Sequence, residues 1–313
     1  MGWSVMAGGK SDSSPDLDEI LSSGQLPALP QSAISVLELS KDSNNGPAEF
    51  AVPIESDPGL TGQVLRFVNS SYFGFSREIS SVKLAITLVG IRTIKNFTLW
   101  SAVFSLMPNP KCGQFDLKAL WQDSLRRGLF ARATGLILGM KEADDLFAAA
   151  LLQDMALPLL VKELPEEYRG LLEAREDGKH RLSDLEQNEF GWTHADAAAK
   201  MARQWALPEQ LATPIEHHIR IEASVVGDSA RFPELAVALS ALLPATNDDT
   251  WVDFEQFEQT FNEVRPSAGP TIAELFGKID VEFEEFAPVL QMSKPTKTLA
   301  ETYEEMKSVA TNA

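Results

Sequence analysis

The sequence has little cysteine: Cys112 is the only one among 313 residues. One thiol cannot form a disulfide within the chain, so disulfide-stapled secreted scaffolds are excluded. We interpret Cys112 as a packed or solvated thiol rather than a nucleophile, because its neighbours show no pattern that would lower the pKa of the thiol.

Basic residues are also scarce. The chain has 27 Lys and Arg against 45 Asp and Glu, a formal charge of −18, and Arg126-Arg127 is only an isolated pair. Such a charge repels phosphate backbones and anionic lipid, which predicts no nucleic-acid partner and no membrane partner. No run approaches the roughly 20 apolar residues that span a bilayer. The start also lacks a secretory signal, so we expect a soluble, cytoplasmic protein.

Strand-like alternation is missing throughout, whereas apolar residues recur at helical spacing almost everywhere after the first two dozen positions. This pattern predicts an all-α fold. Residues 1–24 are rich in Ser, Gly and Asp, which is typical of a flexible leader. We expect one helical domain over 25–220. Residues 221–313 are expected to form a helical, acidic C-terminal extension that packs on or beside it.

Two short segments near the N-terminal end of the domain contain residues that predict local structure. Asp57 precedes Pro58, a pairing that predicts a helix N-cap followed by the first helical turn. Asn69 and Tyr72 lie in a polar and aromatic break after that helix. Either they belong to a recognition surface, or Asn69 caps the helix and the aromatic rings fill the core; we favour the structural interpretation.

The stretch Asp144 to Val161 predicts one buried helix, apolar on nearly every side, with the polar pair Gln153-Asp154 in its middle. An isolated buried carboxylate is unfavourable by several kcal/mol, so Asp154 needs a cation or hydrogen-bond donors. The chain has only four histidines. Three of them, His194, His217 and His218, lie in later helical segments that can pack against this helix.

Several motifs together resemble the HDOD family, bacterial output domains related to HD phosphohydrolases. The resemblance spans about residues 26–220 and is carried by Asp57-Pro58-Gly59-Leu60, Asn69-Ser70-Ser71-Tyr72-Phe73-Gly74, Leu151-Leu152-Gln153-Asp154, Thr193-His194-Ala195-Asp196 and His217-His218. It implies an all-helical domain derived from a metal-dependent hydrolase, generally without a complete catalytic set, that works in bacterial signal transduction.

The resemblance also identifies two departures. Gln153 replaces the histidine of the family's His-Asp pair, and Asp123 replaces the histidine of a Trp-x-His-Ser site. A hydrolytic site of this kind holds two cations close together to activate water. Neutral amides are weak ligands beside imidazole, so we expect no phosphodiester hydrolysis.

The remaining candidates are Asp154, His194 and one of His217 or His218, with Asp123 as a further ligand. Neighbours on a helix point about 100° apart, so only one of the two adjacent histidines is expected to face inward. These residues form either a site for one divalent ion or a buried polar network without metal; we favour the network, and therefore no cofactor.

We therefore expect a non-catalytic bacterial regulatory protein that acts by protein–protein contact with a signalling partner. A residual phosphohydrolase acting on a nucleotide or cyclic dinucleotide is the alternative. A third hypothesis places partner binding on the acidic segment 247–313 alone.

Overall fold

In the computed structural model, residues 15–22, 26–221 and 228–312 are described, and these form helices joined by turns and loops, with no strand among them. The all-α prediction is confirmed. None of the helices in this part of the chain is both long and apolar enough to cross a bilayer. Residues 222–227, near the start of the expected C-terminal extension, lie outside the described residues.

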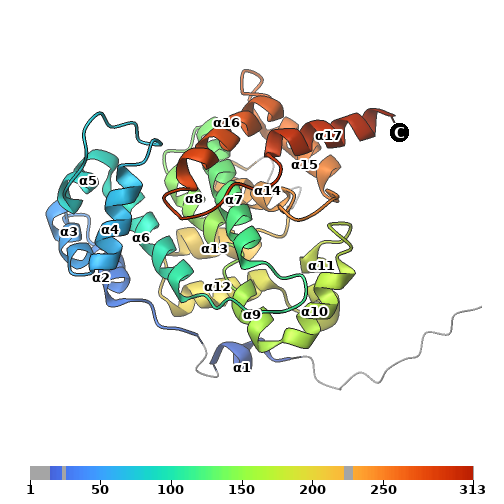
Figure 1. Cartoon of the computed structure of the whole chain (residues 1–313), viewed down its shortest axis with the longest axis horizontal. Helices are drawn as coiled ribbons and strands as arrows, with labels where there is room; N and C mark the ends of the chain where they lie inside the picture. The colour runs from blue at the N-terminus through green and yellow to red at the C-terminus, as the bar shows by residue number, and fades with distance from the viewer. Residues whose placement is uncertain (1–14, 23–25, 222–227, 313) are drawn as a thin grey trace, which may run out of the picture.

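The first group of helices lies at one end of the molecule (Figure 1). It consists of α2 (Gln31–Leu39), α3 (Pro47–Glu55), α4 (Pro58–Val68), α5 (Val82–Val89) and α6 (Ile91–Leu106). Asp57 caps α4 by accepting a hydrogen bond from the Leu60 amide at 3.0 Å, and Pro58 occupies the first turn. The α5–α6 corner is Gly90, whose φ of 94° is one that side chains with a Cβ rarely adopt.

Helices α7 (Leu117–Ile137) and α8 (Ala143–Leu152) pack against each other at the centre of the molecule. Their close approach depends on Gly135 of α7, because a methyl group there would overlap the buried side chain of Leu146 on α8. Helix α6 packs on α8, which joins the first group of helices to the centre.

The segment from Asp144 to Val161 is not the single helix expected from its apolar character. Helix α8 ends at Leu152, a turn follows, and α9 begins at Leu157 and runs to Glu163. Pro158 explains the break: it has no N–H to donate to the Asp154 carbonyl four residues earlier, and its ring would clash with that group. The Leu157 amide bonds that carbonyl instead, at 3.1 Å. The break places Asp154 in a turn.

The remaining helices of the first two thirds of the chain pack around this turn. They are α10 (Pro165–Ala174), α11 (Leu182–Phe190), α12 (His194–Gln204) and α13 (Glu209–His217). Helix α13 packs on α8 and on α12. The turn that holds Asp154 is thus surrounded by the start of α12 and the end of α13.

The C-terminal extension contains a short 3₁₀ helix (Ser229–Arg231) and the helices α14 (Phe232–Ala241), α15 (Phe254–Val264), α16 (Ile272–Phe286) and α17 (Leu299–Asn312). Helices α14 and α16 pack directly on α7 (Figure 1). The regularly spaced phenylalanines of α15 and α16 are buried; they are Phe254, Phe257, Phe261, Phe276, Phe283 and Phe286. The charged residues between them are exposed or half-buried.

Part of the expected leader is folded. Residues Leu17–Ser22 form helix α1, which packs on α12 and buries Leu17 and Leu21. The Trp192 indole N–H also donates to the Pro15 carbonyl at 2.8 Å. Two leucines four residues apart form the buried side of this short helix, although the surrounding composition is polar. The rest of the predicted leader lies outside the described residues.

Candidate functional site

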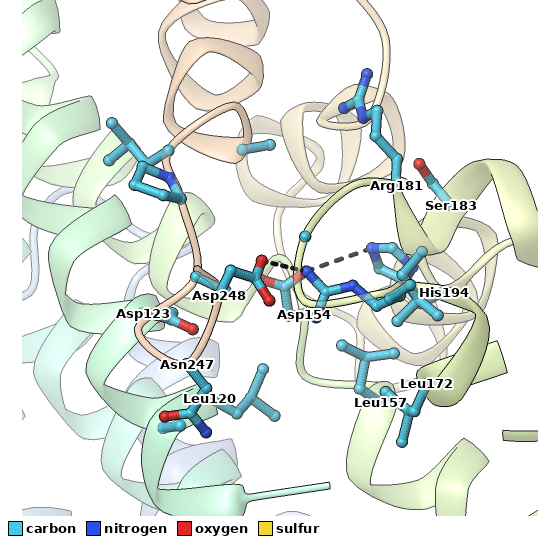
Figure 2. Close-up of a pocket in the computed structure, with 18 of the residues that line it drawn as sticks. Leu120, Asp123, Asp154, Leu157, Leu172, Arg181, Ser183, His194, Asn247 and Asp248 are labelled. Atoms are coloured by element: carbon cyan, nitrogen blue, oxygen red, sulfur yellow. Dashed lines mark hydrogen bonds and ion pairs between the residues drawn. The ribbon is translucent and has the colours of Figure 1, made fainter. Parts of the chain in front are cut away.

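Three buried side chains converge where the α8–α9 turn meets α12 and α13: Asp154, His194 and His218. Asp154 comes from the turn itself. His194 is the first residue of α12, which Thr193 caps by accepting from the Asp196 amide. His218 follows the last residue of α13. A turn, the start of one helix and the end of another therefore bring the three side chains together. Figure 2 shows Asp154 and His194 facing one another inside a cavity.

The ligand atoms of this Asp-His-His cluster form a compact triangle. The Asp154 Oδ1 atom lies 3.4 Å from His194 Nε2 and 3.5 Å from His218 Nε2. The two Nε2 atoms lie 3.2 Å apart. All three side chains are almost completely buried.

The other nitrogen of each ring, Nδ1, already has a hydrogen-bond partner. The Nδ1 atom of His218 lies 2.6 Å from the Ile215 carbonyl oxygen, which can only accept, so this nitrogen carries the proton. The Nδ1 atom of His194 lies 2.6 Å from Glu186 Oε2. Glu186 also accepts from the His194 amide at 2.8 Å and from the Tyr168 hydroxyl at 2.8 Å, as an ionised carboxylate does. The two neutral rings therefore present unprotonated Nε2 atoms.

As a result, three acceptor atoms point at one another. Two imidazole lone pairs and a carboxylate oxygen repel unless a proton or a cation lies between them. A proton on His194 Nε2 meets this need. Although burial opposes it, Glu186 and Asp154 together raise the pKa of His194 to about 10. Burial lowers the pKa of His218.

Arg127 completes the surroundings of Asp154. This arginine lies on α7, and its guanidinium Nη1 bonds Asp154 Oδ2, the carboxylate oxygen that the histidines do not contact. Burial alone would favour the neutral acid, but Arg127 and the two histidines hold the pKa of Asp154 well below its usual value. Asp154 is therefore a buried carboxylate with partners on both oxygens.

The other predicted ligands lie apart from the cluster. Asp123 is buried on α7, but its Oδ1 accepts from the backbone and the hydroxyl of Thr246, in the C-terminal extension. Its pKa is raised by burial, an effect that Arg127 opposes. His217 is 43% exposed and pairs with Glu234 at 2.8 Å. Only one histidine of the adjacent pair therefore faces the cluster, and it is His218.

Gln153 is fully buried, and its amide oxygen lies 3.2 Å from the Ser240 hydroxyl on α14. Its amide nitrogen has no hydrogen-bond partner among the described residues. The side chain thus forms a contact between α8 and α14 rather than part of the triangle.

Asn69 bridges the α4–α5 loop: its amide oxygen accepts from the Ile79 amide at 2.7 Å, and its nitrogen donates to the Leu65 and Ile79 carbonyls.

Two important residues were not identified from the sequence. In the sequence, Arg127 stands out only as half of a basic pair, although it follows Asp123 by one helical turn. Glu186 lies four residues before the buried Phe190, on the inward face of α11. That spacing was the available signal, because a charged residue on an apolar helix face is seldom buried without a partner.

A cavity of about 390 Å³ lies over the cluster. The C-terminal extension supplies one wall, including Asn247 and Asp248 (Figure 2). Six aspartates line the cavity against three arginines. Each arginine is paired with one of them: Arg127 with Asp154, Arg175 with Asp248 and Arg181 with Asp253. The lining is therefore net acidic.

The donor set fits one cation and not two. A tetrahedral ion with bonds of about 2.0–2.1 Å holds its ligand atoms about 3.3–3.4 Å apart, close to the 3.2, 3.4 and 3.5 Å of the triangle. Hydrogen bonds from ligand histidines to a carboxylate and a carbonyl are also the usual support of such sites. A second ion would need donors from Gln153 or Asp123, which bond Ser240 and Thr246 instead.

The described residues thus form an all-α fold that holds a buried Asp-His-His cluster. The HDOD domain model matches residues 26–221, more than half of the chain, and the chain belongs to the HDOD family.

A relative from Treponema pallidum (strain Nichols), an uncharacterised protein, is 23% identical over 196 residues. These are 62% of this chain and only 37% of that protein, so the match covers well under half of the relative's length.

Solved structures show the same fold. An HDOD domain protein of unknown function from Geobacter sulfurreducens superposes with a TM-score of 0.70 at 21% identity, over 87% of this chain and 96% of that one. A candidate phosphohydrolase from Shewanella amazonensis SB2B gives 0.60 at 18% identity, over 93% of each chain. At these identities, the similarity shows a shared fold and nothing further.

Proposed function

We propose that this chain is a non-catalytic regulatory HDOD protein that acts through contact with a signalling protein, and that its Asp-His-His cluster holds a single divalent ion with a structural or sensing role. The observation that carries the proposal is the triangle of Asp154 Oδ1 and the two histidine Nε2 atoms. These three atoms can bind one ion, and no further ligands are placed to bind a second one. The sequence alone favoured a metal-free network; the ligand spacing and the two Nδ1 hydrogen bonds now favour the ion.

Several contacts oppose phosphodiester hydrolysis. Activation of water and clamping of a phosphate by this class of site require two cations about 3.5–4 Å apart. Here the Arg127 guanidinium bonds Asp154 Oδ2, so this oxygen is already paired with a cationic side chain. The acidic lining of the cavity also repels a phosphate.

The cavity wall suggests how the ion would affect a partner. The segment that carries Asp248 and Thr250 contacts the α10–α11 loop, with the Thr250 amide donating to the Asp177 carbonyl at 3.1 Å. The same segment leads into α15. Binding of an ion in the cavity would therefore affect the position of the C-terminal extension. Partner contact through this extension remains part of the proposal.

The test is elemental analysis of protein purified without chelators or a metal-binding tag, combined with a phosphodiesterase assay on bis-p-nitrophenyl phosphate. We expect up to one equivalent of metal and no hydrolysis. His194→Gln and His218→Gln should lose the metal, whereas His217→Gln, the exposed neighbour, should retain it.

Two results would contradict the proposal in different ways. Absence of metal from the wild-type protein, also after incubation with zinc, iron or manganese, would show that the triangle is held by a proton. Metal-dependent hydrolysis that His194→Gln abolishes would instead favour the residual phosphohydrolase.

A further inference from the structure

A second pocket, of about 280 Å³, opens between the first group of helices and the C-terminal extension. We call it the aromatic pocket, because its lining includes Phe67, Tyr72, Phe73, Phe97, Phe147 and Phe286. The α4–α5 loop and the end of α5 form one side of its rim, and α16 contributes Phe286 to another. The HDOD helices and the extension therefore build this pocket together.

Exposed apolar side chains gather at or beside this rim. Phe75 and Leu88 line the pocket and are 38% and 47% exposed. Leu84, one helical turn before Leu88, is 42% exposed, and Val281 on α16 is 60% exposed. These are four of the nine large apolar side chains that are exposed in the described part of the chain. A concave apolar site bordered by exposed apolar side chains is typical of a protein–protein contact.

The side of the rim formed by the α4–α5 loop and α5 is basic, although the chain as a whole is strongly acidic. Residues 58–115 contain six Lys and Arg and a single acid, Glu78, whereas the rest of the chain contains 21 basic and 44 acidic residues. Arg77 lies two residues after Phe75 in the loop, and Lys83 lies on α5. Both are exposed, and neither forms an ion pair with a described residue. This side therefore attracts a surface rich in carboxylates.

The α16 side of the rim is acidic. Residues 280–285 contain four acids and no Lys or Arg. Burial raises the pKa of Tyr72 to about 12; Arg132 opposes this shift, and the charges of Glu282 and Glu285 add to it. The two glutamates therefore lie close enough to the pocket to act on Tyr72. Glu285 is half-buried and forms no ion pair among the described residues.

Inside the pocket, by contrast, the charges are paired. Arg132 Nε donates to Asp144 Oδ1 at 2.9 Å, and the Thr93 hydroxyl donates to Asp144 Oδ2 at 3.1 Å. The rest of the lining is mainly aromatic and aliphatic. The charges without partners therefore lie on the rim, where a large partner can meet them.

We propose that the rim of the aromatic pocket is the contact surface of a symmetric dimer, in which two copies of this chain meet across a two-fold axis. Such a contact uses the same surface on both copies, so the surface must be complementary to itself. A rim with one basic and one acidic side meets this condition, because the rotation places each basic side on the partner's acidic side. The exposed apolar side chains leave water in the same contact.

The two charges of the rim also decide against other protein partners. A uniformly acidic partner would be repelled by the α16 side, and a uniformly basic partner by the side of α5. A second copy of the chain is attracted by both sides at once. The proposal uses none of the residues of the Asp-His-His cluster.

Analytical ultracentrifugation of the full chain tests the proposal. We expect a concentration-dependent equilibrium between monomer and dimer. All runs contain EDTA, so that their outcome does not depend on whether the Asp-His-His cluster binds an ion. A chain that stays monomeric at every concentration would overturn the proposal. Open-ended assemblies larger than a dimer would overturn it too, because they indicate a head-to-tail contact.

Charge reversal on each side identifies the contact. The double variant Arg77→Glu/Lys83→Glu makes both sides acidic, and Glu284→Lys/Glu285→Lys reverses charge on the other side. Each variant alone should dimerise about tenfold more weakly or worse, because like charges then face each other across the axis. An equimolar mixture of the two should form heterodimers, since both contacts of the mixed pair again join opposite charges. A mixture that stays monomeric would contradict the two-fold arrangement.

Matched controls separate the contact from general effects of charge. Leu88→Asp should remove the dimer, whereas Val309→Asp, at an exposed valine of α17, should retain it. Lys111→Glu/Lys118→Glu changes the net charge as much as the basic-side variant does, at two exposed lysines that do not line the pocket, and should also retain it. Circular dichroism checks that each variant is folded. Dimers that survive Leu88→Asp, or that are lost in either control, would overturn the proposal.

Discussion

The Nε2 atoms of His194 and His218 lie 3.2 Å apart, and the hydrogen bonds at the opposite side of each ring leave both atoms without a proton in the neutral state. Two lone pairs at this distance, with the Asp154 carboxylate beside them, form an electron-rich site enclosed by protein. An ion that binds at this site only in the folded protein would therefore change the measured stability of the protein.

Metal binding should appear as thermal stability. An ion that binds only the folded state stabilises it by about 2.7 kcal/mol at a concentration 100 times its Kd. For a chain of this size, that corresponds to a rise in Tm of about 4 °C. We expect EDTA to lower the Tm measured by scanning calorimetry, and added zinc to restore it. His217→Gln should respond in the same way, and a response retained by His218→Gln would contradict the ligand assignment.

Glu186→Gln should destabilise the protein by about 2–4 kcal/mol, measured by urea denaturation. The carboxylate accepts three hydrogen bonds, from Tyr168 and from the ring and amide of His194. An amide places an NH₂ donor opposite one of these donors and leaves it unpaired. Metal affinity should also fall, by about 10–100-fold, because Glu186 orients a ligand ring. Glu189→Gln, on the exposed face of the same helix, is the control and should change neither quantity.

Gly135→Ala should destabilise the protein by about 1–3 kcal/mol because the added methyl group would push Leu146 out of its place between α7 and α8. Gly277→Ala is a matched substitution within α16, where a Cβ meets nothing within 4 Å. It should stabilise the protein slightly, by about 0.5–1 kcal/mol, as alanine does in helices. Equal effects of the two changes on the denaturation midpoint would show that α7 and α8 are not closely packed here.

Asn69→Ala should cost about 1–3 kcal/mol of stability, because the side chain makes three hydrogen bonds that hold the α4–α5 loop. Ser71→Ala, two residues along and exposed, should be neutral. Thermal melts of the two variants decide between a structural and a recognition role. Unchanged stability of Asn69→Ala together with lost partner binding would favour recognition.

Much of the fold could be predicted because it depends on local chemistry. The cap at Asp57 with Pro58 in the next position, and the buried phenylalanines of the extension, follow from residue type and spacing alone. The break between α8 and α9 was missed, because the apolar character of the segment outweighed the single signal of Pro158. Helix α1 was missed because its docking on α12 is a long-range contact that polar composition does not reveal.

The candidate site was predicted in part, because some of its residues can be recognised from residue type alone. Asp154, His194 and the inward-facing member of the histidine pair were identified as a group, from the scarcity of histidine and the need of a buried acid for partners. The choice of His218 over His217 required the geometry of the end of α13. Arg127 could not be assigned, since its approach to Asp154 depends on how α7 packs against the α8–α9 turn.

Helices α7 and α8 each extend from one pocket to the other. Helix α7 carries Asp123 and Arg127 at the first cavity and Arg132 at the aromatic pocket, and α8 begins at Asp144 and is followed by Gln153 and Asp154. The nine residue-to-residue steps from Asp144 to Gln153 span only about 13 Å of helix. An ion or a second copy of the chain that shifts either helix at one end would therefore change the binding free energy at the other, and thermodynamic linkage requires the effect to be equal in both directions. The extension, which contributes a wall to both cavities, would be the part of the molecule that reports the joint occupancy.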